Sequence, residues 1–373
     1  MSRPGRRKGL PHRQVGDAGE LCCSRLQLLP FSGKLESFPS LSGLRADPRR
    51  AAQDDVMFVR VLYHDHCFDG AASAAYFSRF IEGRFHPGAE FGFTGLAHKA
   101  AQLFEDSLFD GDENAIVDFK YSPDPRLTWW FDHHQSAFLS AEDEDHFRRD
   151  SSGRKMFDPG FRSCTSFIAT VARDEFGWEA ADLAGLVHSA DIIDGAQYSD
   201  ARAAVELAEP AMQLTLVIEN SRAPGLMDRI IRWMRHDGLA DIMAQPEIRD
   251  EYGPLYERHL RSIEVIRTRS RLSNGVVAFD VIDEDMEGYN KFIPYYLFPQ
   301  AVYTVSVSTS SFRTKVSVGS NPWAPAAPRH NLATICERYG GGGHARVGAI
   351  SFERGAIDEA RKVAAEIAEE LAH

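Results

Sequence analysis

The stretch Leu127-Thr128-Trp129-Trp130-Phe131-Asp132-His133-His134 joins large hydrophobic residues to three side chains that can bind a metal ion. Aromatic residues favour strands, and the polar residues begin only where the hydrophobic run ends, so residues 127–131 predict a buried strand. Trp129 and Trp130 could stack on a nucleic-acid base, but within a strand they are better explained as core residues.

Two further hydrophobic runs end in the same way. Residues 58–63 predict a strand that is followed by His64, and residues 115–117 predict a strand that is followed by Asp118. Between such runs and after them, the spacing of small and apolar residues predicts helices, over 70–81, 164–176 and 179–190. Strands that alternate with helices indicate an α/β domain with a mainly parallel sheet. In such a sheet, ligands bind outside the carboxyl ends of the strands, so we expect the polar residues to converge in one crevice.

The rest of the chain changes in character. Residues 201–272 are highly charged and predict helices, whereas β-branched runs at 275–282, 301–308 and 312–318 predict the strands of a smaller α+β domain. The predicted organisation is a disordered basic tail (1–56), an α/β domain (57–200), a helical connector (201–272) and a C-terminal α+β domain (273–373).

The charge of the chain is unevenly distributed. The 373 residues carry a net charge of −12, whereas residues 1–50 contain ten Lys or Arg and four Asp or Glu and carry +6, so the remainder carries −18. An acidic body argues against a broad cationic surface for long duplex nucleic acid, because that affinity comes mainly from neutralised phosphates. It is compatible with a metal site built from carboxylates.

Of the five cysteines, Cys22 and Cys23 lie in the N-terminal segment and the other three show no paired spacing, which favours a reduced, cytoplasmic protein. No apolar run reaches the roughly 18 residues that a membrane helix needs. Residues 1–55 are rich in Arg, Pro, Gly and Ser and predict disorder. Because a strand-like run starts directly after Met57, we expect the working protein to begin near that residue.

The polar residues after the three strands are typical of a metal site. Carboxylates and imidazoles together suit Mn²⁺, Mg²⁺, Fe²⁺ or Zn²⁺. Two-metal hydrolysis needs an Asp shared between two cations, where one cation activates water and the other neutralises phosphate charge. Each residue also has a structural alternative, since an Asp at a strand end often caps the next helix.

A run of four glycines, 340–343, precedes His344 and Arg346. Glycine permits close backbone approach, and successive N–H groups can form a nest for an anion. The two polar side chains would add donors for a phosphate. The alternative is a flexible turn between a helix at 332–339 and a strand at 347–352.

Two of these motifs resemble those of a known family. Asp132-His133-His134 resembles the signature of the DHH phosphoesterase superfamily, and the glycine run with His344 resembles the Gly-Gly-Gly-His element of its DHHA1 partner domain, about 210 residues later. The superfamily includes single-strand exonucleases, oligoribonucleases, cyclic-dinucleotide phosphodiesterases and family II inorganic pyrophosphatases. The resemblance covers residues 57–353.

The resemblance assigns a role to each motif residue. It implies that His64, Asp69, Asp118, His133 and Asp191 bind metal, with Asp118 bridging two ions and Asp194 as the alternative to Asp191. It further implies that His134 faces the phosphate, that Asp132 orients its neighbours, and that the second domain binds substrate through Gly341, Gly342, Gly343, His344 and Arg346.

The first motif departs from the common pattern, because Cys67 stands where an Asp is usual, as in a subgroup that reads Tyr-His-x-x-Cys-x-Asp-Gly. A thiolate could bind a softer metal ion. Alternatively Cys67 is a small buried hydrophobe, and one metal position is weak or is completed by Asp65 or His66.

Together these features predict a hydrolase: a metal-dependent phosphoesterase that uses Mn²⁺ or a similar divalent ion. The acidic body favours short substrates such as oligoribonucleotides, nucleoside bisphosphates or cyclic dinucleotides. One alternative is an exopolyphosphatase or pyrophosphatase, and another is a nucleotide- or metal-binding module without turnover, which Cys67 would favour. The oligomeric state that we consider is a homodimer.

Overall fold

The structure is a computed structural model that describes residues 56–97, 104–284, 286 and 288–373. The described elements belong to one compact unit, residues 54–373. The predicted tail therefore lies outside the described residues, apart from Val56. None of the described helices combines the length and the apolar character that crossing a membrane requires.

The first sheet has five strands in the order β2-β1-β3-β4-β5, and every pairing between neighbours is parallel. The α/β prediction is thereby confirmed. Two strands were not predicted, because β2 contains two glycines and β5 is only three residues long. The strands are β1 (Phe58–His64), β2 (Glu90–Leu96), β3 (Glu113–Val117), β4 (Leu127–Asp132) and β5 (Lys155–Phe157).

The strand order places a switch point beside β1. The chain moves from β1 to β2 on one side, and it then places β3 on the other side of β1. At such a point the connections leave in opposite directions and open a crevice at the carboxyl ends of the strands. His64 ends β1 and Asp118 directly follows β3, so both lie at this crevice.

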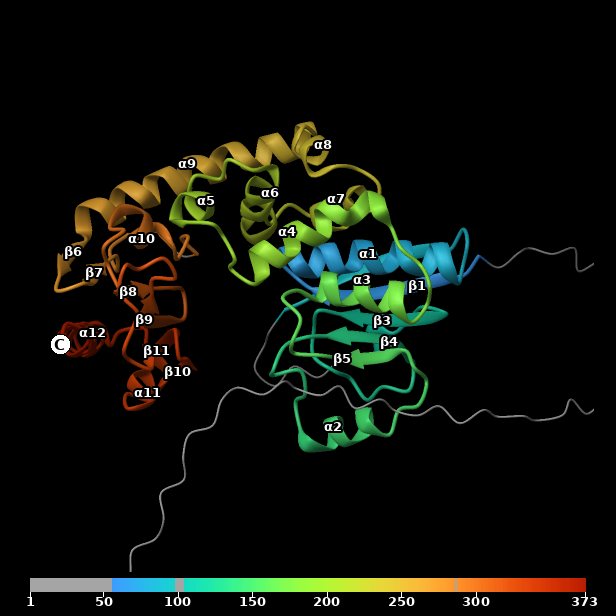
Figure 1. The fold of residues 1–373 in the computed structure, drawn as a ribbon, viewed down its shortest axis with the longest axis horizontal. Coiled ribbons are helices and arrows are strands. Elements are labelled where there is room, and N and C mark those ends of the chain that lie inside the picture. Colours follow the sequence, from blue (N-terminus) through green and yellow to red (C-terminus); the bar gives the residue numbers. More distant parts are fainter. Residues whose placement is uncertain (1–55, 98–103, 285, 287) are drawn as a thin grey trace, which may run out of the picture. The chain divides into compact units, whose positions relative to one another are not determined.

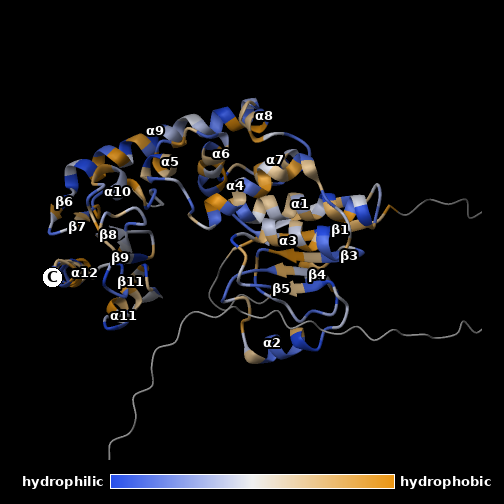
Figure 2. Ribbon diagram, viewed as in Figure 1, coloured by the Kyte–Doolittle hydropathy of each residue, from blue (hydrophilic) through white to orange (hydrophobic). Residues whose placement is uncertain are grey.

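Helices cover both faces of this sheet (Figure 1). One face carries α1 (Phe68–Arg84), α3 (Cys164–Asp174), α4 (Ala184–Asp194) and α7 (Leu226–Met234), and the other carries α2 (Ala141–Arg148). The strand β4 is buried between these layers, and Figure 2 shows hydrophobic colouring along α7, which packs in one of them.

The two tryptophans of β4 belong to the core, as predicted. Trp129 packs in the cluster that includes α1, whereas Trp130 packs in the cluster on the opposite face, and both side chains are fully buried. Successive residues of a strand point to opposite faces, so adjacent tryptophans contribute to different cores.

The second sheet has six strands in the order β10-β11-β9-β8-β7-β6, of which only the β7–β8 pairing is parallel. With the helices beside it, this sheet confirms the expected second α+β region. Its elements are β6 (Arg271–Ser273), β7 (Val276–Asp280), α10 (Ile293–Leu297), β8 (Tyr303–Thr309), β9 (Arg313–Ser320), α11 (Leu332–Glu337), β10 (Gly342–His344), β11 (Val347–Glu353) and α12 (Ile357–Leu371).

Helices occupy most of the segment between the sheets. They are α5 (Ala201–Val205), α6 (Pro210–Asn220), α8 (Leu239–Met243) and α9 (Pro246–Arg269), together with α7. The helix α9 contributes Ile248 to the core of the first sheet and Ile266 to a cluster beside the second. The boundaries of the proposed domains stay predictions.

Gly70 allows α1 to begin directly against the end of β1. A Cβ atom at this position would lie 2.1 Å from the backbone oxygen of His64, which no side chain can accept. The residue after Asp69 must therefore be glycine if β1 and α1 are to hold His64 and Asp69 close together.

We expect Gly70→Ala to lower the free energy of unfolding by about 2 kcal/mol or more, because the added methyl group overpacks a contact between two backbones. Thermal unfolding measures the effect. Gly185→Ala in α4 is the matched control, since nothing lies within 4 Å of a Cβ at that position and alanine favours helix. Equal stability of the two variants would contradict the assigned role of Gly70.

Candidate metal centre

Asp118 lies at the centre of a cluster of polar side chains. It has a φ of 57° in the left-handed region, which Asp adopts more readily than most residues, and its N–H donates to the carbonyl of Phe131 at 2.9 Å. The carboxylate is buried, and within the described chain neither of its oxygens accepts a hydrogen bond. A strained backbone that holds an unsatisfied buried carboxylate is typical of a functional site.

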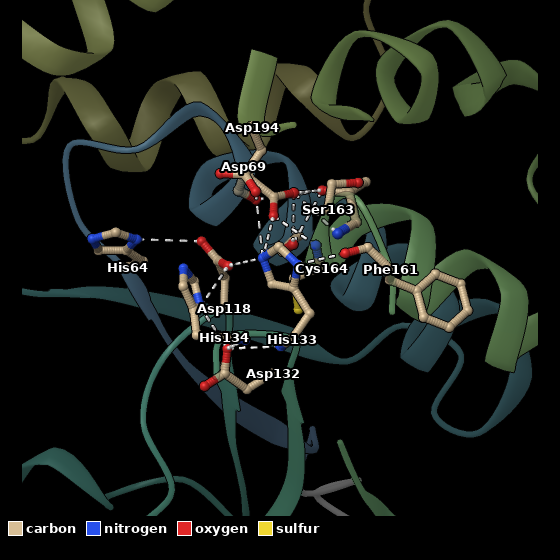
Figure 3. A network of polar contacts seen from close by, with 12 residues as sticks. His64, Asp69, Asp118, Asp132, His133, His134, Phe161, Ser163, Cys164 and Asp194 are labelled. Atoms are coloured by element: carbon tan, nitrogen blue, oxygen red, sulfur yellow. Dashed lines mark hydrogen bonds and ion pairs between the residues drawn. The ribbon is translucent and has the colours of Figure 1, made fainter. Parts of the chain in front are cut away.

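The other predicted ligands surround this carboxylate (Figure 3). His133 Nε2 lies 3.4 Å from Asp118 Oδ1, 3.7 Å from Asp69 Oδ2 and 3.5 Å from Asp194 Oδ2. His64 Nδ1 lies 3.4 Å from Asp118 Oδ2 on the other side. The cluster therefore joins residues that follow β1, β3 and β4 with the end of α4.

Three groups of potential ligand atoms form around Asp118 and His133, each with its atoms within 4.8 Å of one another. They are His64, Cys67 and Asp118; Asp118, His133 and His134; and Asp69, His133 and Asp194. The mixture of carboxylate, imidazole and thiol donors suits divalent transition ions. His133 Nε2 and both Asp118 oxygens are buried without a hydrogen bond in the described residues, and bound cations would satisfy all three atoms. The donor set fits a metal centre.

The electrostatics of the cluster agree with a site for cations. Burial alone would raise the pKa of Asp118, but the attraction of His133 and His64 lowers it to about 2. Burial opposes protonation of His133, yet Asp118 and Asp69 raise its pKa to about 10. Burial and the charges of Asp118 and Asp194 raise the pKa of Asp69. The surplus of buried negative charge therefore favours positive charge at this point.

Asp132 holds the two histidines in place. Its Oδ1 accepts hydrogen bonds from the backbone N–H groups of His133 and His134, at 2.8 and 3.1 Å, and contacts His134 Nδ1 at 2.7 Å. The ring of His133 is fixed by a contact of 3.1 Å between its Nδ1 and the carbonyl of Phe161. Because Nδ1 faces this carbonyl, Nε2 is the ring nitrogen of His133 that faces the carboxylates, which is the usual way to orient a ligating histidine.

Asp69 is positioned by the first turn of α3. Its oxygens accept from the backbone N–H of Cys164 at 2.6 Å and of Thr165 at 3.0 Å, and from the Thr165 hydroxyl at 2.6 Å. A buried carboxylate is stabilised at this place by the positive end of the helix dipole.

Asp194, the alternative to the predicted ligand Asp191, is the carboxylate of α4 that lies beside His133 and Asp69. Asp191 Oδ1 instead accepts a hydrogen bond of 2.7 Å from the Ser163 hydroxyl, which also caps α3. Both residues lie in the last turn of α4, about 4.5 Å apart along its axis. The way α4 packs on α1 and α3 decides which carboxylate reaches His133.

Cys67 is the residue before α1 and lies in one ligand group with His64 and Asp118. Burial, Asp118 and Asp69 raise the pKa of its thiol well above the usual range. Asp65 and His66 belong to none of the three ligand groups. The Asp65 carboxylate accepts a hydrogen bond from the backbone N–H of His66, and His66 Nδ1 contacts the carbonyl of Ile218.

The second half of the glycine run lies in a strand, where the sequence left open an anion-binding nest or a flexible turn. Gly342–His344 is β10, which pairs with β11. A Cβ at Gly341 or Gly343 would lie 2.3 or 2.2 Å from a backbone oxygen of β11, so these two glycines are needed for the close pairing. Arg346 lines a cavity on the second sheet, and the predicted substrate contacts of Gly341, Gly342, Gly343 and His344 stay predictions.

Sequence reasoning missed the Phe161 carbonyl that orients His133, and no sequence pattern marks it, because any residue supplies a carbonyl. It also missed the cavity on the second sheet. The polar residues of that cavity alternate with valines along β8 and β9, a pattern that also fits an ordinary solvent-exposed face.

No family model and no curated protein matches the sequence. Solved structures do match. The pGpG-specific phosphodiesterase PggH from Vibrio cholerae has a TM-score of 0.61 and 18% identity, over 84% of this chain and 98% of that one. The DHH domain of a member of the s1p family of ribosomal proteins has a TM-score of 0.51 and 15% identity, over 84% of this chain and 87% of that one.

A third match is RecJ from Thermus thermophilus in complex with Mn²⁺, with a TM-score of 0.50 and 12% identity, over 84% of this chain and 52% of that one. These likenesses concern the fold, and they agree with the motifs that the sequence carries at Asp132–His134 and around the crevice. The chain has the fold of the DHH-domain proteins.

Proposed function

We propose that this protein is a metal-dependent phosphoesterase that hydrolyses phosphoester bonds in short nucleotide substrates. The observation that carries the proposal is the buried Asp118 carboxylate, which is shared between two groups of potential metal ligands. The DHH fold supports it, since the similar structures include a phosphodiesterase and RecJ with Mn²⁺.

Asp69, Asp118, His133 and Asp194 would hold one divalent ion, and His64, Cys67 and Asp118 a second. Bound ions at such a site lower the pKa of water and offset the charge of a phosphate. We propose Mn²⁺ as the ion, because the donors mix carboxylate and imidazole and the similar RecJ structure is a complex with Mn²⁺.

His134 is the residue that we propose to face the phosphate. The contact with Asp132 raises the pKa of His134 and so favours its imidazolium form. Because Asp132 binds Nδ1, the Nε2 atom of His134 can hold a proton toward the substrate. A positive charge there stabilises the negative charge that develops on phosphate, and its proton can pass to a leaving oxygen.

The acidic body of the chain supports short substrates over long duplexes, because a net charge of −12 repels an extended phosphate backbone. We further propose a cytoplasmic location, in which the cysteines stay reduced.

We expect Asp118→Asn to lower metal-dependent hydrolysis of a panel of short nucleotides by about 1,000-fold, since losing a shared ligand removes several kcal/mol of charge stabilisation. Turnover with added Mn²⁺ and metal content by mass spectrometry measure the effect. Activity that survives the substitution would contradict the site. Nucleotide binding by the wild type without metal-dependent turnover on any substrate would favour a binding module over an enzyme.

Asp194 and Asp191 offer a matched pair of substitutions in one helical turn. We expect Asp194→Asn to weaken Mn²⁺ binding by at least about 10- to 100-fold, because it removes a charged ligand, and Asp191→Asn to leave the affinity nearly unchanged. Isothermal titration calorimetry with Mn²⁺ measures both. The reverse ranking of the two variants would return the ligand role to Asp191.

A thiolate ligand has its own signature. We expect Co²⁺ added to the wild type to give a sulfur-to-metal charge-transfer absorption that is absent in Cys67→Ser, because Cys67 is the cysteine in the ligand groups found among the described residues. Cys336→Ser is the control, since that thiol lies in the core of the second sheet. An unchanged spectrum and stoichiometry in Cys67→Ser would remove Cys67 from the ligands.

A further inference from the structure

The loop between β1 and α1 carries a candidate metal ligand at each end. His64 is the last residue of β1, Cys67 directly precedes α1, and both belong to one ligand group. The two residues between them, Asp65 and His66, are in none of the ligand groups found within the described chain. They contact β2 and α6 instead, two elements that contribute no residue to those groups.

Asp65 fastens the first half of the loop to the edge strand β2. Its backbone N–H donates to the carbonyl of Leu96 at 2.9 Å, directly after the pairing of β1 with β2 ends. Its side chain packs on Gly95, where a Cβ atom would lie 2.4 Å from Asp65 Cγ. An oxygen of the same carboxylate accepts the backbone N–H of His66 at 2.9 Å. The position of His66 is therefore set by contacts that begin at β2.

His66 itself has an unusual backbone conformation. Its φ of 52° lies in the left-handed region, which costs free energy in residues other than glycine. Within the described chain four other non-glycine residues have a positive φ, and one of them is Asp118, the shared candidate ligand. Residues in this region are concentrated at functional sites, where the surrounding contacts keep them there.

The ring of His66 joins the loop to α6. Its Nδ1 lies 3.0 Å from the carbonyl of Ile218, and its Nε2 lies 3.5 Å from Asp65 Oδ2. Ile218 is in the last turn of α6, where carbonyl groups lack partners within the helix. Arg222 Nη1 is 3.2 Å from the same Nδ1 but lies closer to the carbonyl of Ser221, at 2.9 Å. Because a carbonyl can only accept, Nδ1 is the donor in the contact with Ile218.

We propose that His66 is a positioning residue for the second metal ion, because it holds His64 and Cys67 in the geometry that this ion needs. The inference rests on the proposed function and adds a residue to its site. The left-handed conformation turns the chain from β1 into α1, and the ring fixes that turn on α6. Ligands that are held in place before the ion arrives lose less conformational entropy when it binds.

The test measures metal binding by the full-length protein, so that it does not depend on hydrolysis. Isothermal titration calorimetry with Mn²⁺ should show two ions on the wild type. We expect His66→Ala to weaken one of them by about 10- to 100-fold, as is usual when a residue that orients a ligand is lost. The other ion should bind nearly as before, because the group of Asp69, His133 and Asp194 does not include the loop. The charge-transfer absorption of Co²⁺ bound to Cys67 should need correspondingly more Co²⁺.

Two further substitutions separate the ring of His66 from its backbone. Glycine accepts the left-handed conformation but has no ring, so His66→Gly should weaken the same ion, although less than His66→Ala does. His66→Asn should bind like the wild type, because asparagine adopts this conformation readily and its amide N–H can take the place of Nδ1. If His66→Ala does not fold, the comparison of His66→Gly with His66→Asn tests the same point.

Asn274→Ala is the matched control. Asn274 has a φ of 46° in the turn between β6 and β7, so alanine introduces a similar strain in the second sheet. Thermal unfolding should show a loss of stability in both alanine variants. Only His66→Ala should change the binding of Mn²⁺.

Four results would overturn the inference: a single ion on the wild type, wild-type binding in folded His66→Gly, equal weakening of both ions, or a loss in His66→Asn as large as in His66→Gly. Weaker Mn²⁺ binding in Asn274→Ala would also count against it, since general destabilisation would then explain the effect. A wild type that binds one ion and still hydrolyses nucleotides would overturn this inference and leave the proposed function standing. Hydrolysis by the wild type and Asp118→Asn tests that function separately.

Discussion

The buried carboxylate of Asp118 is the constraint on which the rest of the structure depends. It follows β3 in a left-handed backbone conformation, and its two oxygens face His133 on one side and His64 on the other. A carboxylate buried in this way is stable only beside positive charge. The strand order, the glycine at the start of α1 and the contacts of Asp132 and Phe161 all serve to bring imidazoles to it.

The secondary structure of the core could be predicted because its pattern is local. Hydrophobic runs marked β1, β3 and β4, and the residues after them were expected to converge because parallel strands end at one edge of a sheet. The strands β2 and β10 were missed since their glycines weaken the strand pattern. Gly343 of β10 is needed because a Cβ there would collide with the backbone of β11. This requirement can be recognised only once the neighbouring strand is in place.

The choice between Asp191 and Asp194 could not be made from the sequence. The two residues are one helical turn apart, and the rotation of α4 about its own axis decides which of them reaches His133. That rotation depends on packing against α1 and α3, which is a tertiary property.

The helix α9 takes part in more than one core, with Ile248 beside the first sheet and Ile266 beside the second. The backbone hydrogen bonds of a helix link each turn to the next, and in α9 only Pro254 in the helix interior lacks an N–H donor for this series. Melting of either core would therefore remove support from a helix that the other core also uses.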